Sequence, residues 1–369
     1  MPEANSSEDL VSMPPIKSLQ DHPDKSVYEI DPLCDPRWPR FVERHRDASV
    51  FHSVEWLQAL RSTYGYEPFA VTTEAATEEL QNAIVLCRVK SWLTGSRFVG
   101  LPFSDHCEPL LQESHNLGLL VGYLTVHLSK RKWKYLEIRP LSVAPEENSC
   151  LSMNSTYYLH RMDLRKSAGE LFKAFHKDCV QRKVRRAEKE LLVYEEGNSD
   201  LLVDKFYKLL VLTRRRHLLP PQPKSWFRSL AHHFGDKMKI RLASKDGVPV
   251  ASILTLAHKR SMIYKYGGSD AQFNKLGGTP FLFWKTVQDA KENGFEDFDL
   301  GRSDLDNEGL IAFKEHLGAE RQSLHYWRYP NGVPEGQAKW QSKVARIVVP
   351  LAPEASLLAV GNIFYRHMG

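Results

Sequence analysis

The pattern of apolar and polar positions predicts a strand, a helix and a second strand in the last third of the chain. Residues 262–268 fit a strand with period two, apolar residues recur at helical spacing over 280–293, and residues 295–300 fit a second strand in which Phe298 and Leu300 alternate with Asp297 and Asp299. One face of the first strand would carry Met262, Tyr264 and Tyr266. A parallel strand-helix-strand unit is the economical interpretation, and its ligand crevice would lie at the carboxyl ends of the strands.

The flanking residues extend this unit. Upstream we expect a strand over 191–194, helices over 200–217 and 224–234, and strands over 238–243 and 249–257. Asp246-Gly247, between those two strands, is a strong hairpin signal. Downstream we expect a helix that carries Lys314 and a closing strand over 323–329.

The first half of the chain repeats this order. It is predicted to have strands over 27–30, 68–73, 83–89, 97–101, 133–138 and 156–162, and helices over 36–46, 54–63 and 115–128. The chain is therefore an architectural tandem without obvious residue-level repetition. We expect domains at 26–163 and 191–330, a basic linking helix over 164–190, a disordered segment over 1–25 and a helical tail over 331–369.

A glycine pair occurs only in the second copy. Gly277-Gly278 precedes Thr279, a predicted N-cap, and Pro280, a favoured first helical residue. Activated acyl carriers end in phosphates, and helix N-termini bind phosphates. We therefore expect Gly277, Gly278 and Thr279 to bind a donor, and the alternative is that the pair serves only as a turn.

The order of elements resembles the GNAT acyltransferase fold. Two such halves, with the glycine pair only in the second, resemble the Fem-type aminoacyltransferases and the wider FemAB-related, BioF2-like acetyltransferases. The motifs that carry the resemblance are YKYGGSD (264–270), FDLGRSD (298–304) and EGLIAFKEHLGAE (308–320), with weaker matches at FHSVEWLQAL (51–60) and LPFSDHCEPLL (101–111). The resemblance implies an α/β (α+β) protein with tandem GNAT-like domains, each a mixed, mostly antiparallel sheet flanked by helices.

The resemblance also implies an activity, the transfer of an activated acyl or aminoacyl group to an amine. In the peptidoglycan-building members the donor is aminoacyl-tRNA and the acceptor is a cell-wall precursor. We therefore expect acyl-CoA or aminoacyl-tRNA as co-substrate, with no metal. The expected partners are a small-molecule or cell-envelope precursor as acceptor and a tRNA acceptor end.

Lys314 is the strongest candidate for a catalytic residue. On a helical wheel Leu310, Phe313 and Leu317 form the buried arc, and Lys314 lies at the edge of that arc. A lysine there either extends to water or presents its ammonium to a cleft. The resemblance implies the second, because the lysine of the matching FK motif helps to hold the donor and to stabilise charge at the reacting carbonyl.

Other site residues are predicted with alternatives. Arg302 and Asp304, just past a strand end, either bind polar substrate groups or close the loop to the next helix. Tyr264, predicted at the acceptor, and Tyr266, predicted at the donor, either line an acyl slot or belong to the core. The remaining predictions place Lys275 at the donor and Arg216 and Asp270 at the acceptor. The general base stays open between Asp270, Asp304 and water.

Composition fits a soluble enzyme of two domains. The 369 residues carry a net charge of +5, with positive residues concentrated over 165–189 and 214–216. That density suits either a phosphate-rich donor or a solvated helix face. The consecutive titratable residues 105–108 cannot easily converge on one ion, so we predict no metal site. Five scattered cysteines, no membrane-length apolar run and no signal-like N-terminus predict a cytoplasmic protein.

We therefore predict a cytoplasmic N-acyltransferase or aminoacyltransferase of cell-envelope or polysaccharide metabolism. Direct transfer is preferred, because no Ser-His-Asp or Cys-His constellation is readable in the site. The alternative is a GNAT-fold binding or assembly protein that has lost the chemistry. Apolar stripes in the tail, over 344–348 and 357–364, predict packing on the enzyme or peripheral contact with the inner face of a membrane.

Overall fold

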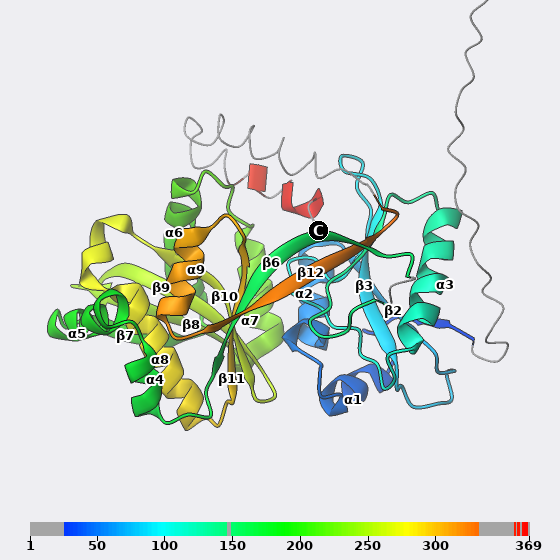
Figure 1. The fold of residues 1–369 in the computed structure, drawn as a ribbon. Coiled ribbons are helices and arrows are strands. Elements are labelled where there is room, and N and C mark those ends of the chain that lie inside the picture. Colours follow the sequence, from blue (N-terminus) through cyan, green and yellow to red (C-terminus); the bar gives the residue numbers. More distant parts are fainter. Residues whose placement is uncertain (1–25, 146–148, 332–357, 359, 362–363, 368–369) are drawn as a thin grey trace, which may run out of the picture.

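The described strands form one continuous sheet. The computed structural model describes residues 26–145, 149–331, 358, 360–361 and 364–367, so the predicted disordered segment and most of the predicted tail lie outside it. The sheet has twelve strands in the order β1-β2-β3-β4-β5-β12-β6-β11-β10-β9-β8-β7 (Figure 1). Adjacent strands are antiparallel except at β4–β5 and β10–β11. The predicted mixed, mostly antiparallel α/β architecture is confirmed.

The elements of the first half follow the predicted order. They are β1 (Tyr28–Ile30), α1 (Arg37–Arg44), α2 (Val54–Tyr64), β2 (Glu67–Thr72), β3 (Ala83–Val89), β4 (Arg97–Val99), α3 (Asn116–Lys130), β5 (Leu136–Ile138) and β6 (Ser152–Asp163).

The second half also keeps the predicted order. It comprises β7 (Val193–Gly197), α6 (Asp200–Arg216), α7 (Lys224–Phe234), β8 (Met238–Lys245), β9 (Val248–His258), β10 (Ser261–Ser269), α8 (Gly278–Glu292), β11 (Asp297–Asp304), α9 (Glu308–His316) and β12 (Glu320–Tyr329). Asp246 and Gly247 both have positive φ, 50° and 79°, as a tight hairpin turn requires.

The two halves exchange their closing strands. β12 pairs with β5 of the first half over Trp327–Tyr329, and β6 pairs with β11 of the second half. In Figure 1 the two long strands β6 and β12 run side by side across the middle of the molecule. The predicted boundary at residue 163 stays a prediction, and the structure adds that β6 belongs to both halves of the sheet.

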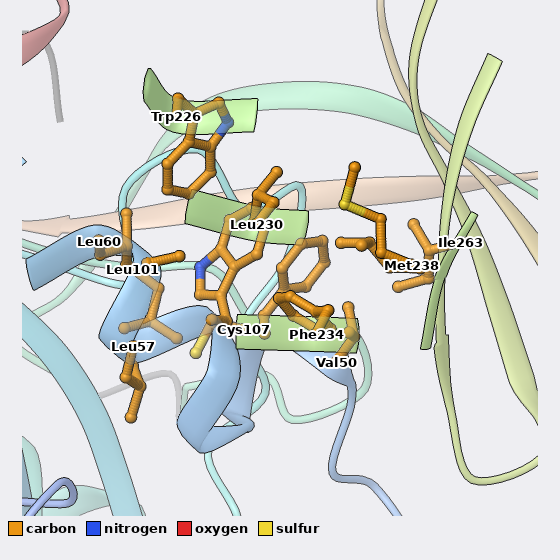
Figure 2. Close-up of a cluster of buried hydrophobic side chains, with 14 of the residues drawn as sticks. Val50, Leu57, Leu60, Leu101, Cys107, Trp226, Leu230, Phe234, Met238 and Ile263 are labelled. Atoms are coloured by element: carbon orange, nitrogen blue, oxygen red, sulfur yellow. The ribbon is translucent and has the colours of Figure 1, made fainter. Parts of the chain in front are cut away.

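One hydrophobic core spans both halves. Figure 2 shows Leu57, Leu60 and Leu101 of the first half packed with Trp226 and Leu230 of the second. The rings of Trp56 and Trp226 meet edge to face at a centroid distance of 5.2 Å. Helices α2 and α7 also pack on each other, so the two halves share a core on this face of the sheet.

The basic linking segment is not one helix. It divides into α4 (Ala168–Ala174), a π-helical turn η2 (Lys177–Gln181) and α5 (Arg182–Lys189). Phe175 ends α4 in an extended conformation and turns the chain before His176 caps the next turn. No helix of the described residues is both long and apolar enough to cross a lipid bilayer.

Candidate active site

Strands β10 and β11 part at the centre of the second half. They pair in parallel at only three positions, from Ser261↔Asp297 to Ile263↔Asp299. Both strands are irregular where they separate, since the register of β10 shifts between Tyr264 and Tyr266 and that of β11 shifts between Asp299 and Arg302. This opening lies at the carboxyl ends of the strands, where the sequence predicted a ligand crevice.

A pocket of about 270 Å³ lies beside this opening, at the start of α8. Its wall includes the helix N-terminus at Gly278 and Thr279, the end of β10 at Ser269, and Phe313 of α9. Lys183 of α5 contributes an exposed positive side chain. The first N–H groups of a helix have no helical partner, so the pocket combines backbone donors, a cation and apolar walls.

The glycine pair is required by packing as well. Gly277 has φ +80°, and a Cβ added there would lie 2.3 Å from the carbonyl oxygen of Lys183. A Cβ at Gly278 would lie 3.0 Å from the Cβ of Ala251. The N-cap of α8 is Gly277, and Thr279 lies in the first turn, so the predicted cap was two residues too late. Phosphate binding by the pair stays a prediction.

Lys314 is buried, not at a solvent border. Its side chain is 3% exposed, and Nζ donates to the carbonyl oxygens of Gly301 at 2.7 Å and Arg302 at 2.9 Å. Burial lowers the pKa of Lys314 to about 8, while Asp105 and Asp299 oppose the shift. Within α9, Ile311 and Lys314 are the buried residues, so the buried face includes Lys314. Leu317 of the predicted arc is buried, and Phe313 is partly buried against the core.

The ammonium of Lys314 thus holds the carbonyls of the β11 irregularity, where β11 separates from β10. A cation fixed at this point stands beside the strand opening. Such a fixed charge is the kind of group that stabilises a developing oxyanion without reorganising. Its role in transfer stays a prediction.

Asp105 of the first half completes the buried charge cluster. Its Oδ2 accepts from Nζ of Lys265 at 2.8 Å, and Nε of Arg302 lies 4.0 Å from Oδ1. The pKa of Asp105 is lowered overall: burial acts to raise it, and Lys265 and Arg302 outweigh burial. The Tyr326 hydroxyl donates to the backbone carbonyl of Asp105 at 2.6 Å. The site is therefore built from both halves.

Arg302 lies within β11 rather than past its end. Its Nη1 donates to the Tyr326 hydroxyl at 3.0 Å, and its guanidinium stacks on the ring of Tyr157 at 4.2 Å. These contacts fix the guanidinium without using all five of its donors. Asp304 is exposed at the last position of β11, and Asn307 supplies the cap of α9. Neither Arg302 nor Asp304 is the predicted cap.

The four consecutive residues after Ser104 serve four different partners. Asp105 pairs with Lys265, and Nε2 of His106 lies 2.9 Å from Oδ2 of Asp299. Sγ of Cys107 lies 3.7 Å from Nε2 of His52. Glu108 accepts from the backbone N–H groups of residues 141–143. Their divergence agrees with the argument that neighbours in sequence do not converge on one ion.

The two tyrosines of β10 face opposite sides of the sheet. The extra residue Lys265 in the strand irregularity puts Tyr264 in the core under α8 and Tyr266 in the core shared by the halves. The Tyr264 hydroxyl covers Gly267 at the opening, where an added Cβ would lie 2.4 Å from it. Tyr266 instead accepts from the indole of Trp226 at 2.9 Å. The prediction that both tyrosines share a face is wrong.

The remaining predicted residues lie around the opening. Nη1 of Arg216 is 3.5 Å from the carbonyl oxygen of Ser269, at the end of β10. The Asp270 side chain accepts from Gln272 N–H and caps the turn before α8. Lys275 is exposed on that turn and does not line the pocket. Binding roles for these residues stay predictions.

Two other features lie apart from this site. A larger hollow of about 640 Å³ lies at α1 and the turn before β3, lined by ion-paired Arg44 and Glu79. In the described residues, His176, Cys179 and His316 hold ligand atoms within 4.8 Å of one another. Nδ1 of His176 accepts from two backbone N–H groups, so Nε2 carries the proton of the neutral ring. A metal bound by His176 would therefore have to displace either the backbone N–H groups at Nδ1 or the proton at Nε2.

Sequence reasoning gave no site role to Lys265 or Asp105, and it included Lys183 only as part of the positive segment 165–189. Asp105 and Lys265 both stand in motifs that carried the family resemblance. Lysine within an otherwise apolar strand was the one local signal for Lys265, because a buried lysine needs a partner. Nothing in the sequence pairs it with Asp105, which is 160 residues away.

Comparison with known proteins finds a domain family and a curated protein that match parts of the chain. Residues 176–315 match the acetyltransferase (GNAT) domain family. The chain is 25% identical over 135 residues to UDP-N-acetylmuramoylpentapeptide-lysine N(6)-alanyltransferase of Weissella viridescens. That match covers 36% of this chain and 40% of the alanyltransferase.

Solved structures share the fold over most of the chain. FemX superimposes with a TM-score of 0.64 at 14% identity, over 86% of this chain and 99% of FemX. A tandem GNAT protein from the clavulanic acid biosynthesis pathway superimposes with a TM-score of 0.53 at 12% identity, over 84% of this chain and 99% of that protein. The C-terminal domain of a putative lysylphosphatidylglycerol synthetase from Agrobacterium fabrum superimposes with a TM-score of 0.53 at 16% identity, over 84% of this chain and 94% of that domain.

The matched region is therefore similar to a GNAT acetyltransferase domain. The fold over most of the chain is similar to that of FemX, and part of the sequence is similar to the Weissella viridescens alanyltransferase.

Proposed function

We propose that this protein transfers an activated acyl or aminoacyl group from acyl-CoA or aminoacyl-tRNA to an amine. The observation that carries the proposal is the opening between β10 and β11, with the α8 N-terminus on one side and the buried Lys314 ammonium on the other. The phosphates of the donor would lie at Gly278, Thr279 and Lys183. Its acyl carbonyl would lie toward Lys314.

Transfer is direct in this proposal. The acceptor nitrogen forms a bond to the acyl carbon, the carbon–sulfur or carbon–oxygen bond to the carrier breaks, and the amine proton leaves to water or a carboxylate. Positioning of two substrates in one cleft supplies much of the acceleration. Half-buried Asp270 and exposed Asp304 remain candidate bases, together with water.

The acceptor belongs to cell-envelope or polysaccharide metabolism in this proposal, and the protein works in the cytoplasm or at the inner face of the membrane. The local similarity to an alanyltransferase of a peptidoglycan precursor supports the acceptor class. The positive α5 surface, with Arg182, Lys183 and Arg186 exposed, supports a phosphate-rich donor such as CoA or a tRNA acceptor end.

Donor binding by the full chain tests the proposal. Native mass spectrometry should show one donor bound when the protein is mixed with CoA, acyl-CoA or aminoacyl-tRNA. Lys183→Glu should weaken that donor's affinity about tenfold in calorimetry, since the substituted side chain repels phosphate. Lys189→Glu makes the same charge change on the same helix, away from the pocket, and should leave the affinity unchanged.

The outcome separates the enzyme from a binding protein. If Lys183→Glu and Lys189→Glu change the donor affinity equally, the donor does not bind in the pocket at the start of α8. Absence of binding by all three donors would favour the alternative, a GNAT-fold binding or assembly protein without transfer chemistry.

A further inference from the structure

Three buried polar side chains share the sheet face beneath α9. In β6, Met162 belongs to the core under α8, so His160, two residues earlier, points to the same side. Ser303 of β11 pairs in register with Tyr158, two residues before His160, and therefore shares that face. Lys314 reaches this region from α9, which contacts both β6 and β11.

These side chains have hydrogen-bonding capacity that the described protein groups do not use. His160 is 0% exposed, and neither of its ring nitrogens has a partner among the described residues. The hydroxyl of Ser303, 1% exposed, likewise has none there. Lys314 has three donors, and two of them go to Gly301 and Arg302. Buried polar groups left without partners are costly, and a buried water commonly joins several of them.

We propose that His160 is a positioning residue for Lys314: together with Ser303 and one shared buried water, it accepts the third hydrogen bond of the Lys314 ammonium. The contact fixes the direction of the ammonium at the strand opening and keeps it charged although it is buried. Its importance for turnover rests on the proposed function, but the contact itself does not.

The electrostatics of the region agree with a neutral acceptor. Burial, and then the charges of Lys314 and Arg321, lower the pKa of His160 to about 4. The ring is therefore neutral near pH 7 and offers one nitrogen lone pair. The charged or titratable groups that act on Lys314 and His160 from the neighbouring elements are Asp105, Lys265, Asp299, Arg302 and Arg321.

The test follows the protonation of Lys314 in the full chain. NMR of protein with ¹³C-labelled lysine gives the Lys314 side-chain signal, assigned by its loss in Lys314→Met, as a function of pH. His160→Leu should lower the titration midpoint of Lys314 by about one pH unit, since the charged form loses an acceptor. At least one of His160→Gln and His160→Asn, which keep an acceptor, should restore the midpoint to within a few tenths of a unit.

His325→Leu is the matched control, because His325 contacts Thr156 on the same sheet and should leave the midpoint unchanged. Equal midpoints in the wild type and His160→Leu would overturn the proposal. If His160→Leu does not fold, Ser303→Ala decides: it should lower the midpoint by a smaller amount, and no change would overturn the proposal. Loss of transfer in Lys314→Met without a midpoint shift in the His160 variants would leave the proposed function intact and reject this inference alone.

Discussion

Asp105 and Lys265 form a buried ion pair between the two halves of the chain, with 2.8 Å between Oδ2 and Nζ. The side chains are 15% and 7% exposed. Asp105 lies in the loop after β4, and Lys265 is the extra residue of the β10 irregularity. The pair therefore connects the first half to the strand opening of the second.

Removing one partner of this pair should destabilise the protein strongly. Asp105→Ala leaves the Lys265 ammonium buried without its counter-ion, and we expect the free energy of unfolding in urea to fall by about 3–5 kcal/mol. Asp105→Ala combined with Lys265→Met should recover part of that loss. The exposed pair Lys90–Glu67 is the control, since Glu67→Ala should change stability by less than about 1 kcal/mol. Similar effects at both sites would contradict the structural importance of the buried pair.

Lys314→Met should abolish transfer and also reduce stability. The carbonyls of Gly301 and Arg302 lose their donor, which should lower the free energy of unfolding by about 1–3 kcal/mol near pH 7. The expectation of little stability loss, drawn from the helical wheel, is replaced because the side chain is buried. Lys189→Met, on an exposed helix face, should change neither property. Full turnover by Lys314→Met would remove the lysine from the mechanism.

The same lysine predicts a pH dependence of stability. Its pKa is about 8 in the folded protein, below the ordinary value of 10.5. Between these values the unfolded chain binds more protons, so the stability contributed by Lys314 is complete above pH 10.5 and is lost as pH falls through 8. Wild type should therefore gain at most about 3 kcal/mol relative to Lys314→Met between pH 8 and 10.5. Parallel stability curves for the two proteins would show an ordinary pKa.

Substitution of Gly277, the residue before α8, should destabilise the protein because the added side chain cannot be packed. Gly277→Ala places a Cβ against the Lys183 carbonyl and strains a residue at φ +80°, so we expect a loss of about 2–4 kcal/mol. Gly247→Ala is the matched control, since its φ is +79° and no atom lies within 4 Å of the added Cβ. That variant should lose only about 1 kcal/mol, and equal losses would mean that backbone strain alone requires glycine at residue 277.

The described end of the tail predicts packing rather than membrane contact. The Tyr66 hydroxyl donates to the carbonyl oxygen of Tyr365, and the Tyr365 hydroxyl donates to that of Pro220. Deleting residues 358–369 should therefore lower the melting temperature, and the intact protein should not float with anionic liposomes. A stable truncated protein, with liposome binding lost, would support the membrane alternative.

The sequence alone determined the order and type of nearly every element. Local signals suffice for this: a short continuous run of apolar residues marks β3, helical spacing marks α7, and Asp246-Gly247 marks a hairpin. The same local reasoning found the crevice, because the glycine pair and the end of β11 lie near each other once a parallel unit is assumed. It also found the Lys314 position through a motif, without its burial.

Only the tertiary structure decided how the halves combine. The exchange of β6 and β12, the shared core of Trp56 and Trp226, and the pairing of Asp105 with Lys265 depend on contacts between residues more than a hundred positions apart. A helical wheel or a strand alternation cannot contain such contacts, because it describes one element without its neighbours. The extra residue in β10 illustrates the reason: one inserted position sends Tyr266 to the opposite face from Tyr264, and only the pairing with β9 reveals it.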